Sequence, residues 1–214
     1  MKSFLIIGMG SFGRHLCREF SEMKCELMIV DKEADTMEDM LPDVVSARVG
    51  DCTKEGVLES FDIPSFDACF VCIGSDFESS LQITSLLKEL GAKRVFSKAD
   101  RDIQEKFLLH NGADYVIYPE KNTAHNIALQ EISDSIFDAL TLTEDYMICE
   151  ILPRNEWVGK TVVDINMRRK YRLSLLAIKR GNEVIPMPGL DYRFRDGEHV
   201  IVLGHVKDIQ DYAF

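Results

Sequence analysis

A chain of 214 residues, with 46% hydrophobic and 29% charged residues, is long enough to bury a core and is typical of a soluble globular protein of one domain or two small ones. The formal net charge of −11 argues against nucleic acid as a partner and against adsorption to an anionic membrane, because both surfaces require a basic protein. No apolar run approaches the ~20 residues of a membrane span. The chain also passes from Met1 to an apolar run without a signal peptide, so we expect a cytosolic protein.

The first two-thirds of the chain alternates apolar runs with helical stretches. The runs are continuous, which is typical of parallel strands buried on both faces. They are Phe4–Ile7, Leu27–Val30, Val44–Val49, Ala68–Ile73, Arg94–Phe96 and Tyr115–Ile117. Six strands with helical crossovers predict an α/β fold with a Rossmann-like, doubly wound parallel sheet. Its ligand crevice is expected between the ends of the first and fourth strands.

Capping residues mark the helices between these runs. We expect Ser75-Asp76 to cap a helix that runs toward Leu90 and is ended by Gly91, and Asp100 to cap one that runs through His110. A further helix is predicted from Asn122 to about Phe137. Its apolar stripe at helical spacing consists of Ala124, Ile127, Ala128, Ile132 and Ile136. The stripe follows a finished Rossmann unit, so it packs either on its own domain or on another chain.

The pattern changes near residue 140. Short strands separated by turn signals follow, at Met147–Leu152, Leu175–Ile178, Val184–Ile185 and His199–Leu203. A short helix is predicted from Val162 to Arg169. This composition predicts a small α+β domain over residues 141–214, after a nucleotide-binding domain over residues 1–140.

The most informative motif is Gly8-Met9-Gly10-Ser11-Phe12-Gly13, which follows the first apolar run and opens a helix. Gly8 permits a tight turn, Gly10 lets backbone N–H groups approach a diphosphate, and Gly13 lets helix and strand pack closely. Asp31 ends the second run, where the dinucleotide fingerprint places an acid that binds the ribose and repels a 2′-phosphate. The motif predicts an adenine-nucleotide site.

Three charged residues follow other strands at the same edge of the sheet. Asp51 either accepts from the adenine amine or caps the helix expected over Lys54–Phe61. Glu120 is either a site residue or a solvated acid at a helix start. Lys98 either reaches a phosphate or is a surface lysine. The segment that begins with Ile73 and Gly74 is expected opposite the glycine loop.

The six cysteines do not form a recognisable site. Cys69 and Cys72 lie in one predicted strand, and residues three apart on a strand point to opposite faces. We therefore interpret them as small buried residues in a reducing compartment.

A dehydrogenase would need a substrate domain and a proton donor beside the nicotinamide. No such donor, no Walker lysine and no Ser/His/Asp grouping is visible in the sequence, which favours a protein that binds a nucleotide without transforming it, and so not an enzyme. The alternative is an NAD-linked oxidoreductase or redox sensor.

These motifs resemble those of the cytosolic regulatory subunits of bacterial Trk/Ktr potassium uptake systems (KtrA-like). These are RCK proteins, regulators of potassium conductance, with an N-terminal nucleotide-binding (TrkA-N) domain and a C-terminal TrkA-C domain. The resemblance covers the whole chain. It is carried by Gly8–Gly13, Val30-Asp31, Gly50–Thr53, Ile73-Gly74, Gly112–Asp114, Tyr118–Lys121, Asp164–Tyr171 and Leu176–Arg180.

The resemblance implies that ATP or ADP, or alternatively NAD(H), binds at the glycine loop. The positions assigned to this site are Gly8, Gly10, Ser11, Phe12, Gly13, Asp31, Lys32, Asp51, Cys52, Ile73, Gly74 and Lys98. Glu120 matches a glutamate that holds a divalent cation, Mg²⁺ or Ca²⁺, beside the phosphates. Ktr-type proteins often have Arg where this chain has Ser11.

The resemblance also implies an assembly and a function. Homodimers form an octameric ring beneath an integral-membrane potassium pore subunit, so the chain is expected in the cytoplasm at the inner face of the membrane. Ligand binding changes the shape of the ring and gates the pore. Cyclic di-AMP is implied as a second ligand in the C-terminal domain, at positions that match Arg168 and Pro188.

Overall fold

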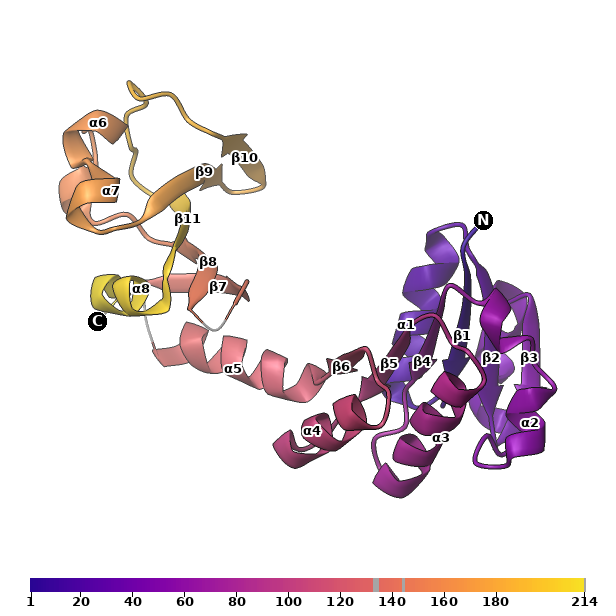
Figure 1. Cartoon of the computed structure of the whole chain (residues 1–214). Helices are drawn as coiled ribbons and strands as arrows, with labels where there is room; N and C mark the ends of the chain where they lie inside the picture. Colours follow the sequence, from indigo (N-terminus) through magenta and orange to yellow (C-terminus); the bar gives the residue numbers. More distant parts are fainter. Residues whose placement is uncertain (133–134, 144, 214) are drawn as a thin grey trace. The chain divides into compact units, whose positions relative to one another are not determined.

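The computed structural model describes residues 1–132, 135–143 and 145–213 (Figure 1). The chain divides into two compact units, Met1–Glu120 and Lys121–Phe214. Within the described residues, no helix is both long and apolar enough to cross a lipid bilayer.

The N-terminal unit is built on a parallel sheet of six strands. They are β1 (Ser3–Ile7), β2 (Glu26–Asp31), β3 (Ser46–Val49), β4 (Ala68–Val71), β5 (Val95–Lys98) and β6 (Tyr115–Ile117). Their order is β3-β2-β1-β4-β5-β6, and every neighbouring pair is parallel. The doubly wound sheet is therefore confirmed. The strand order reverses between β1 and β4, where a ligand crevice is expected.

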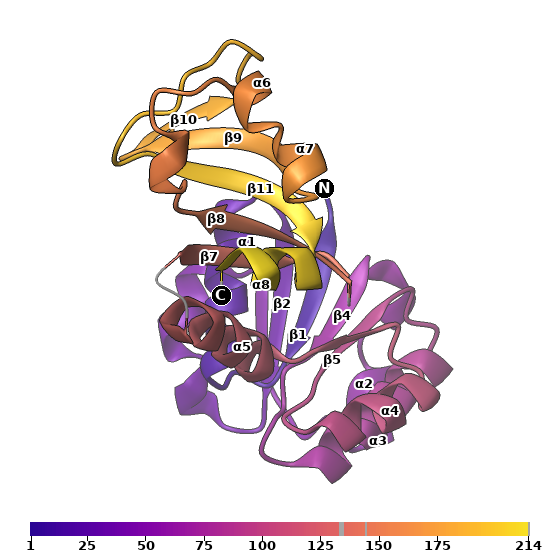
Figure 2. The same ribbon diagram turned by 90° about the vertical axis from the view of Figure 1, so that its left-hand side faces the viewer.

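Two layers cover the sheet and bury a core on each face. One consists of α1 (Ser11–Glu22) and the short 3₁₀ segments η1 (Ala34–Thr36) and η2 (Glu38–Asp43). The other consists of α2 (Glu55–Glu59), η3 (Ile63–Ser65), α3 (Phe77–Glu89) and α4 (Asp102–His110). Figure 2 shows α2, α3 and α4 grouped together. Cys69 lies in one core and Cys72 in the other, which confirms that the two thiols face away from each other.

The expected cap of α3 is confirmed. Asp76 occupies the N-cap, and its carboxylate accepts from the backbone N–H of Ser79 at 3.1 Å. The helix ends at Leu90, and the following Gly91 has a φ of +87°, which favours glycine.

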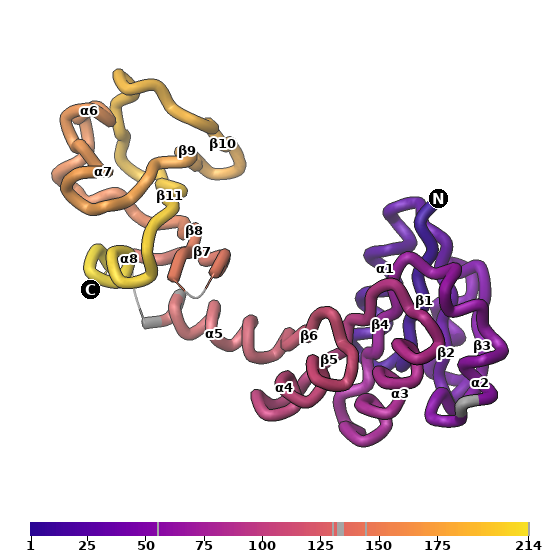
Figure 3. The backbone as a smooth tube through the Cα atoms, in the orientation of Figure 1, coloured from indigo at the N-terminus to yellow at the C-terminus, as the bar shows by residue number. Residues whose placement is uncertain are grey.

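The C-terminal unit is an antiparallel sheet in the order β10-β9-β11-β8-β7. The strands are β7 (Ile136–Thr141), β8 (Tyr146–Ile151), β9 (Ser174–Arg180), β10 (Glu183–Pro186) and β11 (His199–His205). Trp157, which lies in the 3₁₀ segment η4 (Asn155–Trp157), is buried in the core beneath the sheet. The final helix α8 (Val206–Ala213) contacts β8 and β11 (Figure 3).

The helix expected from Asn122 to Phe137 differs from the structure. Helix α5 spans Pro119–Ile132, and Ile136 already belongs to β7, which pairs with β8. Ile136 and Ala139 of β7 are buried in the C-terminal core. Because Ile136 also fits the helical spacing of the predicted stripe, the sequence pattern did not reveal this strand. The two compact units divide between Glu120 and Lys121, so β7, which pairs with β8, belongs to the C-terminal unit.

The other residues of the stripe have mixed environments. Ala124, Ile127 and Ala128 are exposed in the structure, while Leu129 packs on the C-terminal core. The side chain of Ile132 lies outside the described residues.

The predicted short helix from Val162 to Arg169 is two helices, α6 (Val162–Ile165) and α7 (Met167–Lys170). Asn166 separates them because it adopts the left-handed conformation, with φ of 49°.

Candidate functional site

The glycine loop after β1 is built by two close backbone approaches. Gly8 has a φ of +92°, and its N–H donates to the carbonyl oxygen of Val30 at 2.9 Å. A Cβ added to Gly13 would lie 2.1 Å from the carbonyl oxygen of Gly8. The fold itself therefore requires glycine at both positions.

The fold alone does not require a glycine at position 10. Its φ of −65° and ψ of −172° are open to any residue, and an added Cβ would meet nothing within 4 Å. It is the N-cap of α1, and no side chain caps that helix end. Unpaired N–H groups at a helix N-terminus attract an anion, and a phosphate lying against the backbone would explain the glycine. The residues present therefore fit a nucleotide diphosphate.

The next two residues of the motif differ in burial. Ser11 is exposed at the first position of α1, whereas the ring of Phe12 is half-buried and packs on the core of the α1 layer. Phe12 thus has a structural role that is independent of any ligand.

Asp31 ends β2 and ties the glycine loop to the following turn. Its Oδ2 accepts from the N–H of Met9 at 2.6 Å, and its Oδ1 accepts from the N–H of Glu33 at 2.9 Å. Lys32, which lies between Asp31 and Glu33 in the sequence, is exposed. Each carboxylate oxygen retains a second acceptor site, so a ribose hydroxyl can donate to Asp31 while both bonds persist.

Asp51 follows β3 and closes a local turn. Its Oδ1 accepts from the backbone N–H of Thr53 at 3.0 Å and from the Thr53 hydroxyl at 2.6 Å. The hydroxyl bond is the main reason that the pKa of Asp51 lies below its ordinary value. Helix α2 begins at Glu55 with Lys54 as its N-cap, so the interpretation of Asp51 as that cap is wrong.

Two of the expected site residues offer mainly their backbone. The side chain of Cys52 is buried in the core beside α2, where burial raises its pKa to about 12. Ile73 is half-buried, and its Cγ1 would lie 2.8 Å from a Cβ added to Gly8. The end of β4 therefore does lie against the glycine loop, as the sequence predicts.

Lys98, at the end of β5, forms two ion pairs at this edge of the parallel sheet. Its Nζ lies 2.9 Å from Oδ1 of Asp100 and 2.8 Å from Oε1 of Glu120. Burial disfavours the ammonium charge, but the hydrogen bonds to Glu120 and Asp100 outweigh it and raise the pKa of Lys98. A Cβ added to Gly74 would lie 2.9 Å from this Nζ. Lys98 is 12% exposed and is therefore not an ordinary surface lysine.

Glu120 lies in the first turn of α5 and is 62% exposed. Its bond to Lys98 is the main reason that its pKa lies below the ordinary value. Within the part of the chain that the structure describes, no group of three His, Cys, Asp or Glu side chains is placed to hold a metal ion. A cation at Glu120 would therefore need further oxygen ligands from a bound nucleotide.

The sequence reasoning missed Asp100, which it assigned to a helix cap. Helix α4 begins at Asp102 with Arg101 as its N-cap, and the N–H of Asp100 donates to Oε1 of Gln104 at 2.8 Å. The cap assignment is wrong, and Asp100 pairs with Lys98 instead. The available signal was a lysine and an aspartate two residues apart at a strand end.

The two positions proposed for a second ligand lie in the C-terminal unit. Arg168 is exposed on α7, and Pro188 is half-buried in the turn after β10.

The fold and the glycine loop define a Rossmann protein of the dinucleotide-binding type with a small α+β unit attached. Comparisons with known proteins give the family. The TrkA-N domain matches residues 4–119, and the TrkA-C domain matches residues 147–213. The chain belongs to this TrkA family, and among its members it is of the Ktr type.

Curated relatives align along almost the whole chain. Ktr system potassium uptake protein C of Bacillus subtilis (strain 168) is 36% identical over 208 residues, which is 97% of this chain and 94% of that protein. Ktr system potassium uptake protein A of the same organism is 31% identical over 98% of this chain and 94% of that protein. The protein A of Vibrio alginolyticus is 28% identical over 95% of this chain and 92% of that protein.

Solved structures share the fold at low identity. The GsuK channel gives a TM-score of 0.74 at 12% identity, over 100% of this chain and 39% of that chain. The GsuK channel bound to NAD gives a TM-score of 0.71 at 14% identity, over 99% of this chain and 39% of that chain. These likenesses confirm an RCK-type architecture.

Proposed function

We propose that this chain is the nucleotide-sensing regulatory subunit of a potassium uptake system. The proposal rests above all on the 36% identity to a Ktr system potassium uptake protein, which runs through both domains. Gly10 gives independent support, because its glycine is explained by a bound phosphate and not by the fold.

The ligand that we propose is an adenine nucleotide, ATP or ADP, with NAD(H) as the alternative. The phosphates lie against the backbone at Gly10, and Asp31 accepts from the ribose. Asp51 accepts from the exocyclic amine of the adenine, and Lys98 supplies a positive charge to the phosphates. NAD is supported by the NAD-bound GsuK channel, which has the same fold.

A divalent cation, Mg²⁺ or Ca²⁺, accompanies a bound triphosphate in this proposal, and Glu120 is its protein ligand. Hard cations prefer carboxylate and phosphate oxygens. Only Oε1 of Glu120 is bound to Lys98, and the side chain is 62% exposed, so a cation can reach the other oxygen or take the place of the lysine.

The proposed action is a change in the shape of a ring. Homodimers assemble into an octamer beneath an integral-membrane pore subunit, which holds the chain at the cytoplasmic face of the membrane. A ligand moves such a ring only if it binds one shape more tightly than the other. Because Ser11 replaces the arginine frequent in Ktr-type proteins, we expect the contrast between ATP and ADP to depend on Glu120 or Arg14. Cyclic di-AMP remains a proposed second ligand at Arg168 and Pro188.

Catalysis or redox sensing is the alternative, and the thiols argue against redox sensing. Burial raises the pKa values of Cys52, Cys69 and Cys72 to about 12, and a thiol that stays protonated is a poor nucleophile. Oxidation of NADH in the presence of a panel of carbonyl compounds would support the enzyme and contradict the regulator.

Light scattering and small-angle X-ray scattering test the regulatory proposal. We expect a mass of eight chains and a scattering curve that differs between ATP, ADP and NADH. A monomer at micromolar concentration, or an octamer with the same curve in every nucleotide, would contradict the gating mechanism.

A further inference from the structure

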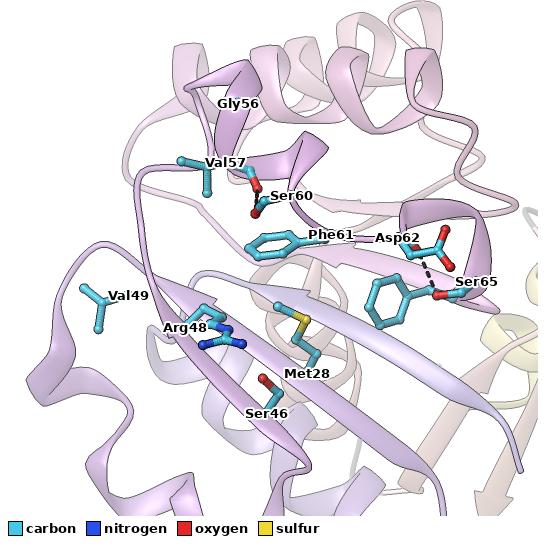
Figure 4. A pocket seen from close by; sticks show the side chains of 11 residues that line it. Met28, Ser46, Arg48, Val49, Gly56, Val57, Ser60, Phe61, Asp62 and Ser65 are labelled. Carbon is cyan, nitrogen blue, oxygen red and sulfur yellow. Dashed lines mark hydrogen bonds between the residues drawn. The ribbon is translucent and has the colours of Figure 1, made fainter.

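A pocket in the N-terminal unit lies outside the proposed nucleotide site. It has a volume of about 670 Å³ and lies over β2 and β3, on the face of the sheet that carries α2 (Figure 4). Its walls include none of the residues assigned to the glycine loop, the ribose or the phosphates. The volume lies within the range of small-molecule sites, which is about 300–1,000 Å³.

The pocket exists because this part of the sheet is incompletely covered. Helix α2 has only five residues, and the chain then turns through η3 toward β4. Met28 of β2 is the register partner of Ser46 in β3, and Arg48 is two residues further along β3. Alternate residues of a strand share a face, so Met28, Ser46 and Arg48 form one floor.

One part of the pocket wall is aromatic, and the remainder is largely polar. Phe61 and Phe66 line it, and both rings are half-buried against the core beneath α2. Figure 4 shows the ring of Phe61 and the guanidinium of Arg48 directed into the same space. Together with Met28, these rings favour an aryl or bulky alkyl group.

The polar groups of the pocket fall into two sets. The hydroxyls of Ser60 and Ser65 donate to the carbonyl oxygens of Val57 and Asp62, each at 2.6 Å. In contrast, no hydrogen bond or ion pair to any described residue is found for the side chains of Ser46 and Arg48. Arg48 is exposed, and a guanidinium with its donors available beside aromatic side chains matches a carboxylate.

The charges of the pocket restrict the ligand further. Among the lining residues that the structure describes, Arg48 is the only cation and Asp62 the only anion, and no ion pair between the two is found. One guanidinium balances one negative charge, whereas a dianionic phosphate would carry a second charge near Asp62.

We propose that this pocket, here called the β3 pocket and defined by Met28, Ser46, Arg48, Phe61 and Phe66, binds a small monocarboxylate with an aromatic or branched apolar body. The carboxylate pairs with Arg48 and accepts from the hydroxyl of Ser46, and the apolar body lies against the two phenyl rings.

Benzoate is the probe, and benzamide is its neutral counterpart of the same shape. We expect saturation-transfer NMR on the full chain to give a dissociation constant for benzoate of about 1 mM, as befits so small a ligand. Benzamide should bind at least about tenfold more weakly, because it lacks the charge that Arg48 recognises.

Three variants separate this site from others. Arg48→Gln should weaken benzoate about tenfold, and Ser46→Phe, which fills the floor, should abolish its binding. Arg18→Gln is the matched control, because Arg18 is exposed on α1, in the layer on the other face of the sheet, and should bind benzoate like the parent. Thermal unfolding checks that each variant is folded.

The proposal is overturned if Arg48→Gln and the parent bind benzoate equally, or if benzamide binds as tightly as benzoate. It is also overturned if no transfer occurs at about 10 mM benzoate, tenfold above the expected constant. Displacement of benzoate by ATP or NADH would place the probe in the nucleotide site and equally refute the β3 pocket. The results with benzamide and with the Arg48 and Ser46 variants do not bear on nucleotide binding, so the proposal fails or stands independently of the regulatory function.

Discussion

Alanine is expected to have different effects at two glycines of the Gly8–Gly13 loop. Gly13→Ala should lower the stability of the fold, whereas Gly10→Ala should leave stability nearly unchanged and weaken nucleotide binding. In Gly13→Ala, the new Cβ would lie 2.1 Å from the carbonyl oxygen of Gly8, and it would also meet the Cβ of Cys72 at 3.4 Å. The nearest atom is a backbone oxygen, which cannot move aside as the end of a flexible side chain can. In Gly10→Ala, the new Cβ would meet no atom within 4 Å.

The magnitudes follow from these distances. Overpacking of backbone against backbone at Gly13 should lower the free energy of unfolding by about 1–3 kcal/mol or more. At Gly10, alanine restricts the unfolded chain but is a slightly poorer N-cap, so stability should change by less than about 1 kcal/mol. The Gly10→Ala methyl group would lie where we propose that a phosphate approaches the N-terminus of α1, and we expect it to weaken the binding of ATP and NADH by at least about tenfold, or 1.4 kcal/mol.

Urea unfolding and titration calorimetry on the two variants and the parent give both quantities. A Gly10→Ala chain that binds every adenine nucleotide like the parent would refute the placement of the phosphates. A Gly13→Ala chain as stable as the parent would refute the close approach of α1 to the loop.

Three further predictions concern charged residues. Asp31→Asn should narrow the preference for NAD over NADP from about tenfold toward unity, because the repulsion of the 2′-phosphate is removed; parent binding of NADP as tight as NAD, measured by calorimetry, would contradict this. Glu120→Gln should abolish the gain in ATP affinity that Mg²⁺ or Ca²⁺ confers, and an equal gain in both proteins would reduce Glu120 to a solvated acid. Glu198 is 1% exposed, and burial opposes its charge, but hydrogen bonds from Arg180 and from the preceding turn hold its pKa below the ordinary value. The stabilisation that these bonds give the folded state is therefore present above the unfolded pKa of 4.5 and is lost as the pH falls through the lower pKa of the folded state. Glu198→Gln should therefore cost about 1–3 kcal/mol at pH 7 and less at pH 3, as urea unfolding at the two pH values will show.

The N-terminal architecture was predictable because its signals are local. Continuous apolar runs, Asp76 with its helix, and the Gly8–Gly13 loop each depend on residues that are close in sequence. The loop could be placed at the switch point because strand order in this fold follows from the alternation of strands and helices.

The remaining features depend on contacts that local patterns do not contain. Ile136 fits both a helical stripe and a strand, and only its pairing with β8 decides between them. Asp100 is an acceptable cap by position, yet Lys98 at the end of β5 pairs with its carboxylate, and the Gln104 side chain accepts from the backbone at the start of α4 instead. The β3 pocket follows from the shortness of α2, a helix for which the sequence suggested a greater length.

The bonds within the site suggest how it would distinguish nucleotides. Asp31 keeps acceptor capacity beside its bonds to Met9 and Glu33, so a ribose adds contacts without breaking any. Glu120 differs, because its Oε1 is already bound to Lys98, and a cation can bind the other oxygen or take the place of the lysine. In our proposal, a triphosphate with its cation supplies partners to both members of the Lys98–Glu120 pair at once, a metal for Glu120 and a phosphate for Lys98, whereas a diphosphate without the cation supplies a phosphate to Lys98 alone. Because this pair joins the end of β5 to the first turn of α5, its exchange would act on that helix. A regulatory subunit needs such a ligand-dependent difference, and here it would arise from two charges without the arginine that Ser11 replaces.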